Sequence, residues 1–147
     1  KRYYNKVVGA NSRLDELQAG LLRVRLKYMQ ELTDERIQLA ARYSAKIKND
    51  KLILPQVRED ADSVWHQYVI RTEKRDELID YLNGLNIGTI IHYPIPPHLS
   101  EAYAYLGFKK GDYPITEEYA ETVLSIPMYN GMTIEEQDRV IDALNAF

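Results

Sequence analysis

Cysteine is absent from this sequence, which excludes disulfide bonds and thiolate metal sites and favours a reducing compartment such as the cytoplasm. No apolar run approaches the roughly 20 residues that a membrane-spanning helix requires. Basic residues are not in excess, because 19 lysines and arginines face 22 aspartates and glutamates, for a net charge of -3. A nucleic-acid surface needs concentrated positive charge. We therefore expect a cytoplasmic protein that binds neither membranes nor nucleic acids.

Several catalytic motifs are missing as well. The sequence has no glycine-rich phosphate loop, no serine-centred nucleophile turn and no zinc-protease motif. Its three histidines, His66, His92 and His98, lack the i, i+4 spacing of a metal pair on a helix. We therefore expect no metal site.

The chain does contain enough apolar sequence for one hydrophobic core. Hydrophobic residues make up 45% and charged residues 28%, within the ordinary globular range. A length of 147 residues is close to the commonest domain size, so residues 1–147 are expected to form a single domain. The sequence also has 12 tyrosines, an unusually large number. Because a tyrosine ring is apolar with a polar tip, we expect some of them to line a pocket or a subunit contact.

A long amphipathic helix is predicted near the N-terminus. Apolar residues recur at steps of three and four along residues 14–47. We expect a helix over residues 12–48, capped by Asn11 or Ser12 and bent near Thr33. A helix of that length crosses a whole domain, so we expect it to link two domains or to pack on a second subunit.

The rest of the chain alternates short strands with short helices. Alternating β-branched and aromatic residues predict strands, and capping residues ahead of an apolar stripe predict helices. The expected strands cover residues 52–54, 64–72, 87–91 and 125–127, and the expected helices cover 72–84, 100–106, 116–124 and 133–147. Thr133 and Glu136 form a capping box ahead of the last helix. The predicted fold class is α/β, of the α+β kind, with a long N-terminal helix and a small, mostly antiparallel sheet covered by helices.

The turn at residues 9–13 is a candidate anion site. The amide of Asn11 would lie beside the free N–H groups of a helix N-terminus, where donors converge and the helix dipole favours negative charge. Arg13 adds a positive charge two residues later. A simple helix cap without a ligand is the commoner use of such a turn, and the spacing leaves both interpretations open.

A second candidate site is the proline-rich loop at residues 92–98. Its three prolines restrict the backbone, so the loop can present His92 and Tyr93 to a ligand at little entropic cost. An imidazole and a phenol can donate hydrogen bonds to the phosphate and hydroxyl groups of a ligand. In the structural alternative, His92 ends a strand and Tyr93 packs on Trp65. No role is assigned to His98.

Five motifs follow one another along the chain. They are a glycine–asparagine turn that enters a helix, a second helical stretch with a Glu-Arg pair, a strand-then-helix unit, the His-Tyr-Pro loop, and a Leu-Ser-Ile-Pro-Met element. They occupy residues 9–20, 35–43, 64–78, 92–98 and 124–128. Together they resemble the DegT/DnrJ/StrS family, the pyridoxal-phosphate-dependent aminotransferases that act on nucleotide-linked keto sugars. The resemblance covers essentially the whole chain.

The resemblance implies a fold like the C-terminal domain of fold-type I aminotransferases. In this family an asparagine at the position of Asn11 reaches across a dimer to the cofactor phosphate of the neighbouring subunit. Arg13 matches an arginine close to the same shared cleft. His92 and Tyr93 match an element that enters the partner subunit's active site near the nucleotide sugar. Asn11 is therefore the expected cofactor-binding residue, and Arg13, His92 and Tyr93 are the expected substrate-binding residues.

The resemblance also implies a reaction. The intact enzyme would be a homodimer that uses pyridoxal 5'-phosphate to transfer an amino group, from a donor such as glutamate, to a keto sugar. Its product would serve lipopolysaccharide, polysaccharide or other deoxyamino-sugar biosynthesis. In the family the cofactor lysine lies upstream of the glycine–asparagine turn. We therefore expect this chain to be the C-terminal domain alone, without the lysine-bearing domain and with no catalytic residue of its own.

Two other functions stay open at this point. A sugar dehydratase of the same family carries a histidine in place of the cofactor lysine, and only sequence upstream of the turn would separate the two. A non-catalytic dimerisation or ligand-binding module would also account for the amphipathic helix and the many tyrosines.

Overall fold

A small antiparallel sheet lies at the centre of the fold, in a computed structural model that describes residues 3–147. Strand β1 (Tyr68–Arg71) pairs with strand β2 (Val123–Ile126), with Tyr68 opposite Ile126 and Arg71 opposite Val123. The helices are α1 (Glu16–Leu26), α2 (Met29–Lys46), α3 (Arg75–Gly84), the 3₁₀ helices η1 (Pro97–Leu99) and η2 (Glu101–Leu106), α4 (Pro114–Thr122) and α5 (Ile134–Ala146). The predicted fold class, helices around a small antiparallel sheet, is confirmed.

The sheet is narrower than the sequence predicted. The two strands expected around Ile53 and Ile90 shorten to single bridges, from Ile53 to Arg71 and from Ile90 to Ser125. The order across the sheet is therefore Ile53, β1, β2, Ile90. Pro55 limits the first of these segments because proline has no N–H to donate to a neighbouring strand.

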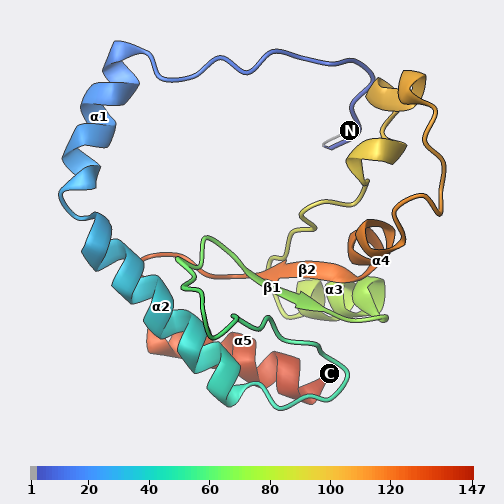
Figure 1. Ribbon diagram of the computed structural model, residues 1–147. Coiled ribbons are helices and arrows are strands. Elements are labelled where there is room, and N and C mark those ends of the chain that lie inside the picture. The colour runs from blue at the N-terminus through green and yellow to red at the C-terminus, as the bar shows by residue number, and fades with distance from the viewer. Residues whose placement is uncertain (1–2) are drawn as a thin grey trace.

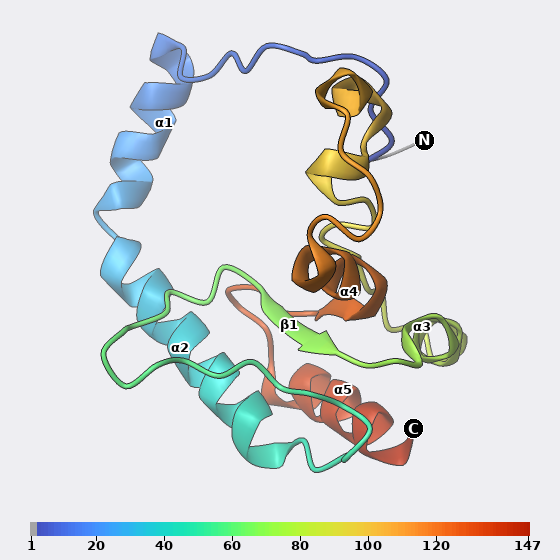
Figure 2. The same ribbon diagram turned by 45° about the vertical axis from the view of Figure 1, so that its right-hand side comes forward.

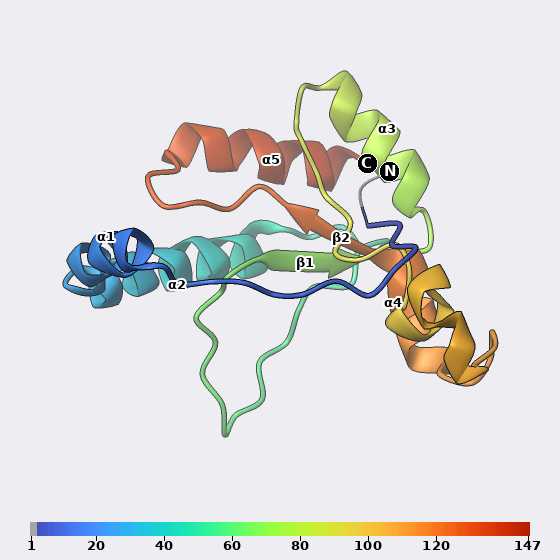
Figure 3. The same ribbon diagram turned by 90° about the horizontal axis from the view of Figure 1, so that it is seen from above.

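The hydrophobic core lies on one face of this sheet. Helices α3 and α5 lie on the same side of the sheet in Figure 3, and α2 packs with them. The largest fully buried apolar side chains are Tyr43, Tyr68, Ile70, Leu78, Leu82, Leu124 and Leu144. Because side chains alternate along a strand, Val69, Arg71 and Ser125 point to the opposite face. This opposite face, called the open face below, carries the candidate site.

The helix predicted over residues 12–48 is two helices. At the end of α1 the N–H groups of Lys27 and Tyr28 bond to carbonyls three residues back, at 3.3 and 3.0 Å, instead of four. The break therefore lies at residues 27–28 and not near Thr33. Helix α2 buries core side chains while α1 buries none, so packing does not hold the two to one axis.

The cap of the first helix also differs from the prediction. Helix α1 is capped by Asp15, whose carboxylate accepts a hydrogen bond from the N–H of Gln18 at 2.7 Å. Asn11 therefore lies upstream of the helix N-terminus instead of capping it. The capping box of α5 is confirmed, because Thr133 Oγ1 accepts from the Glu136 N–H and the Glu136 carboxylate accepts from the Thr133 N–H.

The N-terminal segment runs from η2 across to α1 (Figures 1 and 2). At its start the carbonyl of Asn5 accepts hydrogen bonds from the Ala102 N–H at 3.1 Å and the Ser100 hydroxyl at 3.2 Å. The ribbon forms an open ring in which α1 projects away from the core. Apolar side chains of α1 are exposed, for example Leu17 at 75% and Leu21 at 63%. Length and apolar content rule out a membrane span for every helix within residues 3–147.

Candidate functional site

His92 lies against the open face of the sheet. Its Nδ1 is 2.9 Å from the hydroxyl oxygen of Ser125 in β2, and its Nε2 is 3.4 Å from the side-chain amide nitrogen of Gln67. At Ser125, β2 is paired with Val69 on one side and Ile90 on the other, so the imidazole rests on the central strand. Sequence reasoning found His92 but missed Gln67 and Ser125. Both lie inside motifs that carry the family resemblance, which is the signal that could have identified them.

Tyr93 projects from the same loop and is 58% exposed. Its ring centroid lies 5.1 Å from that of Tyr3 and 5.4 Å from that of His92, both in edge-on geometry. The peptide bond between His92 and Tyr93 is cis. Trp65 stacks on Tyr68 with a centroid distance of 5.5 Å. The ring of Tyr93 thus contacts those of Tyr3 and His92, whereas that of Trp65 stacks on Tyr68, and the loop displays an exposed phenol beside the imidazole.

A cleft of about 540 Å³ opens beside His92 on the open face. The guanidinium carbon of Arg71 lies 4.3 Å from the centroid of the Tyr119 ring, and its Nη1 is 3.1 Å from a carboxylate oxygen of Glu118. The full lining is Ile53, Leu54, Pro55, Gln56, Val69, Arg71, His92, Tyr119 and Val123. A guanidinium, an imidazole and an amide in one half-open cleft suit a hydroxyl-rich ligand. No lysine lines the cleft, and every lysine within residues 3–147 is exposed.

Asn11 and Arg13 lie on another part of the molecule from His92. Both are exposed, in the segment without regular secondary structure that leads to α1 (Figure 1). The structure therefore brings the predicted site residues together in two pairs: Asn11 with Arg13, and His92 with Tyr93. The anion site formed by an amide at a helix N-terminus is absent from the described chain, because Asp15 occupies the capping position. Side-chain donors alone would have to bind an anion at Asn11.

His98 belongs to a separate cluster that fastens the loop after η2 to α4. Its Nε2 lies 2.9 Å from Glu117 Oε1, and both side chains are nearly buried. The same carboxylate accepts hydrogen bonds from the N–H groups of Gly111 at 2.8 Å and Tyr113 at 3.3 Å. Burial by itself would raise the pKa of Glu117, but the hydrogen bonds from His98, Gly111 and Tyr113 outweigh it and lower that pKa. His98 thus has a structural partner in the described chain.

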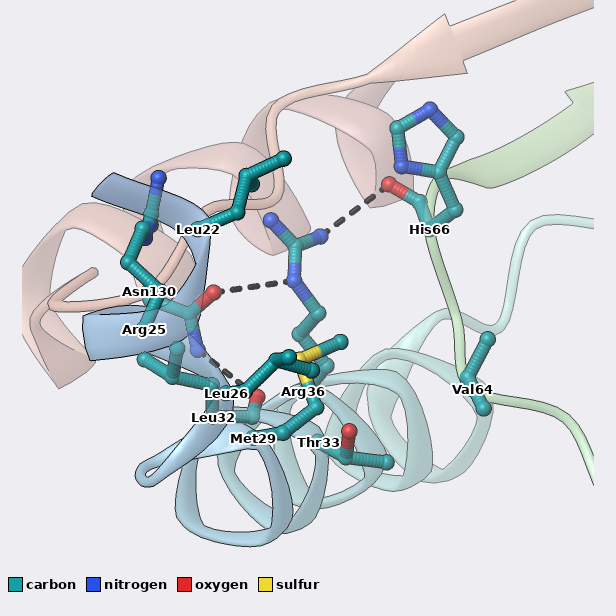
Figure 4. A pocket seen from close by; sticks show the side chains of 10 residues that line it. All are labelled: Leu22, Arg25, Leu26, Met29, Leu32, Thr33, Arg36, Val64, His66 and Asn130. Atoms are coloured by element: carbon teal, nitrogen blue, oxygen red, sulfur yellow. Dashed lines mark hydrogen bonds between the residues drawn. The ribbon is translucent and has the colours of Figure 1, made fainter. Parts of the chain in front are cut away.

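The pocket in Figure 4 lies where α1, α2 and the segment before β1 meet. Its volume is about 460 Å³ and most of its lining is apolar. Arg36 lies at its centre, where Nε donates to Asn130 Oδ1 at 2.9 Å and Nη1 donates to the carbonyl of His66 at 3.0 Å. Asn130 in turn donates to the carbonyl of Leu32 at 2.8 Å. These bonds join α2 to the segment before β1 and to the loop after β2, so the guanidinium has a structural role.

Glu35 adds to these bonds. Its carboxylate accepts hydrogen bonds from Asn130 Nδ2 at 2.7 Å and from the Gly131 N–H at 2.6 Å. These bonds lower the pKa of Glu35. The Glu-Arg pair noted in the second helical stretch is thereby explained as a tie between α2 and the loop after β2.

Comparison with known families identifies a match over nearly the whole chain. The model of the DegT/DnrJ/EryC1/StrS aminotransferase family matches residues 1–145. The chain is 42% identical over 147 residues to a dTDP-3-amino-3,6-dideoxy-alpha-D-galactopyranose transaminase from Aneurinibacillus thermoaerophilus. That alignment covers 100% of this chain but 40% of the relative, so the chain spans well under half the length of the relative.

Solved structures share the fold. DesV from S. venezuelae superposes with a TM-score of 0.87 at 40% identity, over 99% of this chain and 40% of DesV. NtdA from Bacillus subtilis, crystallised with bound cofactor PMP, superposes with a TM-score of 0.78 at 33% identity, over 92% of this chain and 33% of NtdA. In both cases this chain corresponds to one part of a longer polypeptide.

Proposed function

The chain belongs to the DegT/DnrJ/EryC1/StrS aminotransferase family, and on that premise we propose that it is the C-terminal domain of a pyridoxal-phosphate-dependent nucleotide-sugar aminotransferase. The match over residues 1–145, with a relative named as a dTDP-sugar transaminase, carries the proposal. The acceptor is a nucleotide-linked keto sugar and the amino donor is glutamate. The product serves polysaccharide or other deoxyamino-sugar biosynthesis in the cytoplasm.

The residues present fit the phosphate end of pyridoxal phosphate. Asn11 is exposed, and its side-chain amide can donate hydrogen bonds to phosphate oxygens. When bound, the cofactor supplies an electron sink for the carbanion at the amino carbon. No lysine of residues 3–147 lines the cleft, so the lysine that would bond to the cofactor is proposed to come from other sequence.

The loop at His92 and Tyr93 supplies the sugar end of the site. The imidazole is held on the central strand by Ser125 at 2.9 Å, and the phenol beside it is exposed. Both groups can form hydrogen bonds to sugar hydroxyls. Arg13, on the other segment, provides the positive charge for the diphosphate. The role of these residues is to bind and orient the sugar, whereas proton transfer belongs to groups outside this chain.

A homodimer follows from this assignment. Asn11 and His92 lie on separate segments of one chain, so a complete site would combine these segments with other polypeptide, including a second copy. The exposed apolar side chains of α1 offer a surface for that contact. A two-fold dimer would use the same surface of both copies.

A chimaeric protein tests the proposal. This chain is joined to the part of the Aneurinibacillus thermoaerophilus transaminase that it does not match, and amination of a dTDP-linked keto sugar by glutamate is measured. We expect turnover in the presence of pyridoxal phosphate. Asn11→Ala is expected to weaken cofactor affinity by a factor of about 10 to 150, because a hydrogen bond to a charged group is worth about 1.5–3 kcal/mol.

Asn83→Ala serves as the matched control, because Asn83 is an exposed asparagine on α3. It is expected to leave cofactor affinity unchanged. A folded, dimeric chimaera that forms no amino sugar would contradict the proposed reaction. An active chimaera with equal cofactor affinity in both asparagine variants would instead contradict only the role of Asn11.

A further inference from the structure

The contacts of His92 with Gln67 and Ser125 indicate which ring nitrogen carries the proton. We propose that Gln67 and Ser125 are positioning residues that hold His92 as the neutral Nδ1–H tautomer. Its Nε2 is then an acceptor that takes a hydrogen-bond donor of the substrate, such as a hydroxyl or amine, instead of a phosphate oxygen. The assignment of His92 to the substrate rests on the function proposed above, whereas the tautomer does not.

The first step is the contact with Gln67. The amide nitrogen of Gln67 lies 3.4 Å from His92 Nε2. An amide NH₂ group can only donate, so the imidazole nitrogen that faces it must be the acceptor. A neutral imidazole with an unprotonated Nε2 carries its hydrogen on Nδ1.

The second step is the contact with Ser125. His92 Nδ1 lies 2.9 Å from the Ser125 hydroxyl, a good distance for an N–H···O hydrogen bond. The hydroxyl can act as the acceptor, because a serine oxygen has two lone pairs. Ser125 is 7% exposed and paired on both sides within the sheet, so the acceptor is fixed before any ligand arrives. The Ser125 contact therefore fits the Nδ1–H tautomer that the Gln67 contact selects.

The two contacts differ in strength. The bond to Ser125 is short and comes from the central strand, while the contact with Gln67 is long and comes from the residue just before β1. A ligand group can replace Gln67 at Nε2 at a smaller cost than it can replace Ser125 at Nδ1. The exchangeable edge of the ring is therefore Nε2.

This tautomer determines the ligand chemistry at His92. The ionised diphosphate bridge of a nucleotide sugar offers only acceptor oxygens, and an acceptor nitrogen gives it no hydrogen bond. A sugar hydroxyl or an amine can donate to Nε2. The diphosphate would then be bound elsewhere, by groups that always donate, such as the guanidinium of Arg13.

Long-range ¹H–¹⁵N NMR spectroscopy of the 147-residue chain, labelled with ¹⁵N-histidine, tests the proposal without any substrate. Spectra are recorded at about pH 8.5, roughly two units above the usual imidazole pKa, and the signals of His92 are identified by their loss in His92→Asn. We expect Nε2, the nitrogen that couples to both ring protons, to resonate in the unprotonated range. A protonated Nε2 in the unmodified chain would overturn the proposal.

Two variants should move the proton in a predictable way. Ser125→Ala removes the acceptor at Nδ1, and Gln67→Glu places an acceptor at Nε2, so both should increase the Nε2–H form. Ser125→Thr keeps the hydroxyl and should restore the original pattern. Ser44→Ala is the control, since it removes a hydroxyl that lies 2.8 Å from the Tyr68 hydroxyl. Unchanged tautomers in both Ser125→Ala and Gln67→Glu would contradict the positioning role.

Inorganic phosphate tests the ligand class in the same spectra. At millimolar concentrations it should leave the ¹⁵N shift of His92 Nε2 unchanged. Movement of that shift towards the protonated range would show that phosphate takes the site, and would overturn the donor assignment. Because neither experiment requires turnover, loss of the proposed aminotransferase activity and loss of this inference can be told apart.

Discussion

The carboxylate of Glu117 holds the loop after η2 in place and makes the stability of the folded chain depend on pH. The hydrogen bonds from His98, Gly111 and Tyr113 lower the pKa of Glu117 in the folded chain below its value in an unfolded one. A group whose pKa is lowered on folding stabilises the fold above the unfolded pKa. That contribution is lost as the pH falls through the folded pKa.

We predict that Glu117→Gln lowers the free energy of unfolding at pH 7. The same change should reduce the amount by which that free energy falls as the pH is lowered. An amide retains one acceptor oxygen, so it cannot satisfy all the donors that face the carboxylate. Urea unfolding between pH 7 and about pH 3 measures the effect. Glu121→Gln is the control, because Glu121 lies on the same helix with an exposed side chain. Equal pH slopes for the unmodified chain and Glu117→Gln would contradict the prediction.

Individual residues divide into those that sequence reasoning found and those that it missed. His92 and Tyr93 stood out because a proline-rich loop displays them. Gln67 and Ser125 did not, because an amide and a hydroxyl are common in any strand. Ser125 lies 33 positions from His92, and only the pairing of β2 with Ile90 brings the two side chains together.

At the level of elements, α1 and α5 behave in opposite ways. Both have a helical pattern of apolar residues, but α5 buries that face against the core and α1 buries no residue. A helix of 11 residues is marginally stable in water without such packing. We infer that α1 depends on polypeptide outside this chain, or on a second copy, for its full stability.

Two leucines test this difference. Leu21→Lys on α1 is expected to change the free energy of unfolding of the isolated chain by no more than about 0.5 kcal/mol, because Leu21 is 63% exposed. Leu144→Ala on α5 is expected to lower it by about 2–5 kcal/mol, because Leu144 is fully buried and the change leaves a cavity. Denaturant unfolding followed by circular dichroism measures both. A cost for Leu21→Lys similar to that for Leu144→Ala would show that α1 already has a partner.

The whole molecule forms an open ring with the candidate site residues on separate segments (Figure 1). The chain spans 40% of the length of its relative from Aneurinibacillus thermoaerophilus. In the described part of the chain, no lysine lines the cleft beside His92. These observations suit a domain that contributes binding groups to a site completed by other polypeptide.

We therefore predict that the isolated 147-residue chain does not transaminate. A mixture of the chain, pyridoxal phosphate, glutamate and a dTDP-linked keto sugar should yield no 2-oxoglutarate above the rate without protein. The assay is a coupled measurement of 2-oxoglutarate, with the chimaeric protein as the positive control. Turnover by the isolated chain would show that a lysine within it serves the cofactor.

The sequence by itself determined the local features of this protein. The capping box at Thr133, the core face of α5 and the short, mostly antiparallel sheet follow from patterns that span a few residues, and the ordered motifs pointed to the family. Local patterns succeed because capping and amphipathicity depend on neighbours within one or two turns.

Only the tertiary structure decided where α1 begins and breaks, how narrow the sheet is, and which groups face the imidazole of His92. Each of these depends on contacts between residues far apart in the chain. A helix with the right period still ends where packing stops supporting it, and a strand extends only as far as a neighbour pairs with it. Gln67 lies just before β1 and Ser125 lies in β2, so their meeting at His92 is a property of the fold.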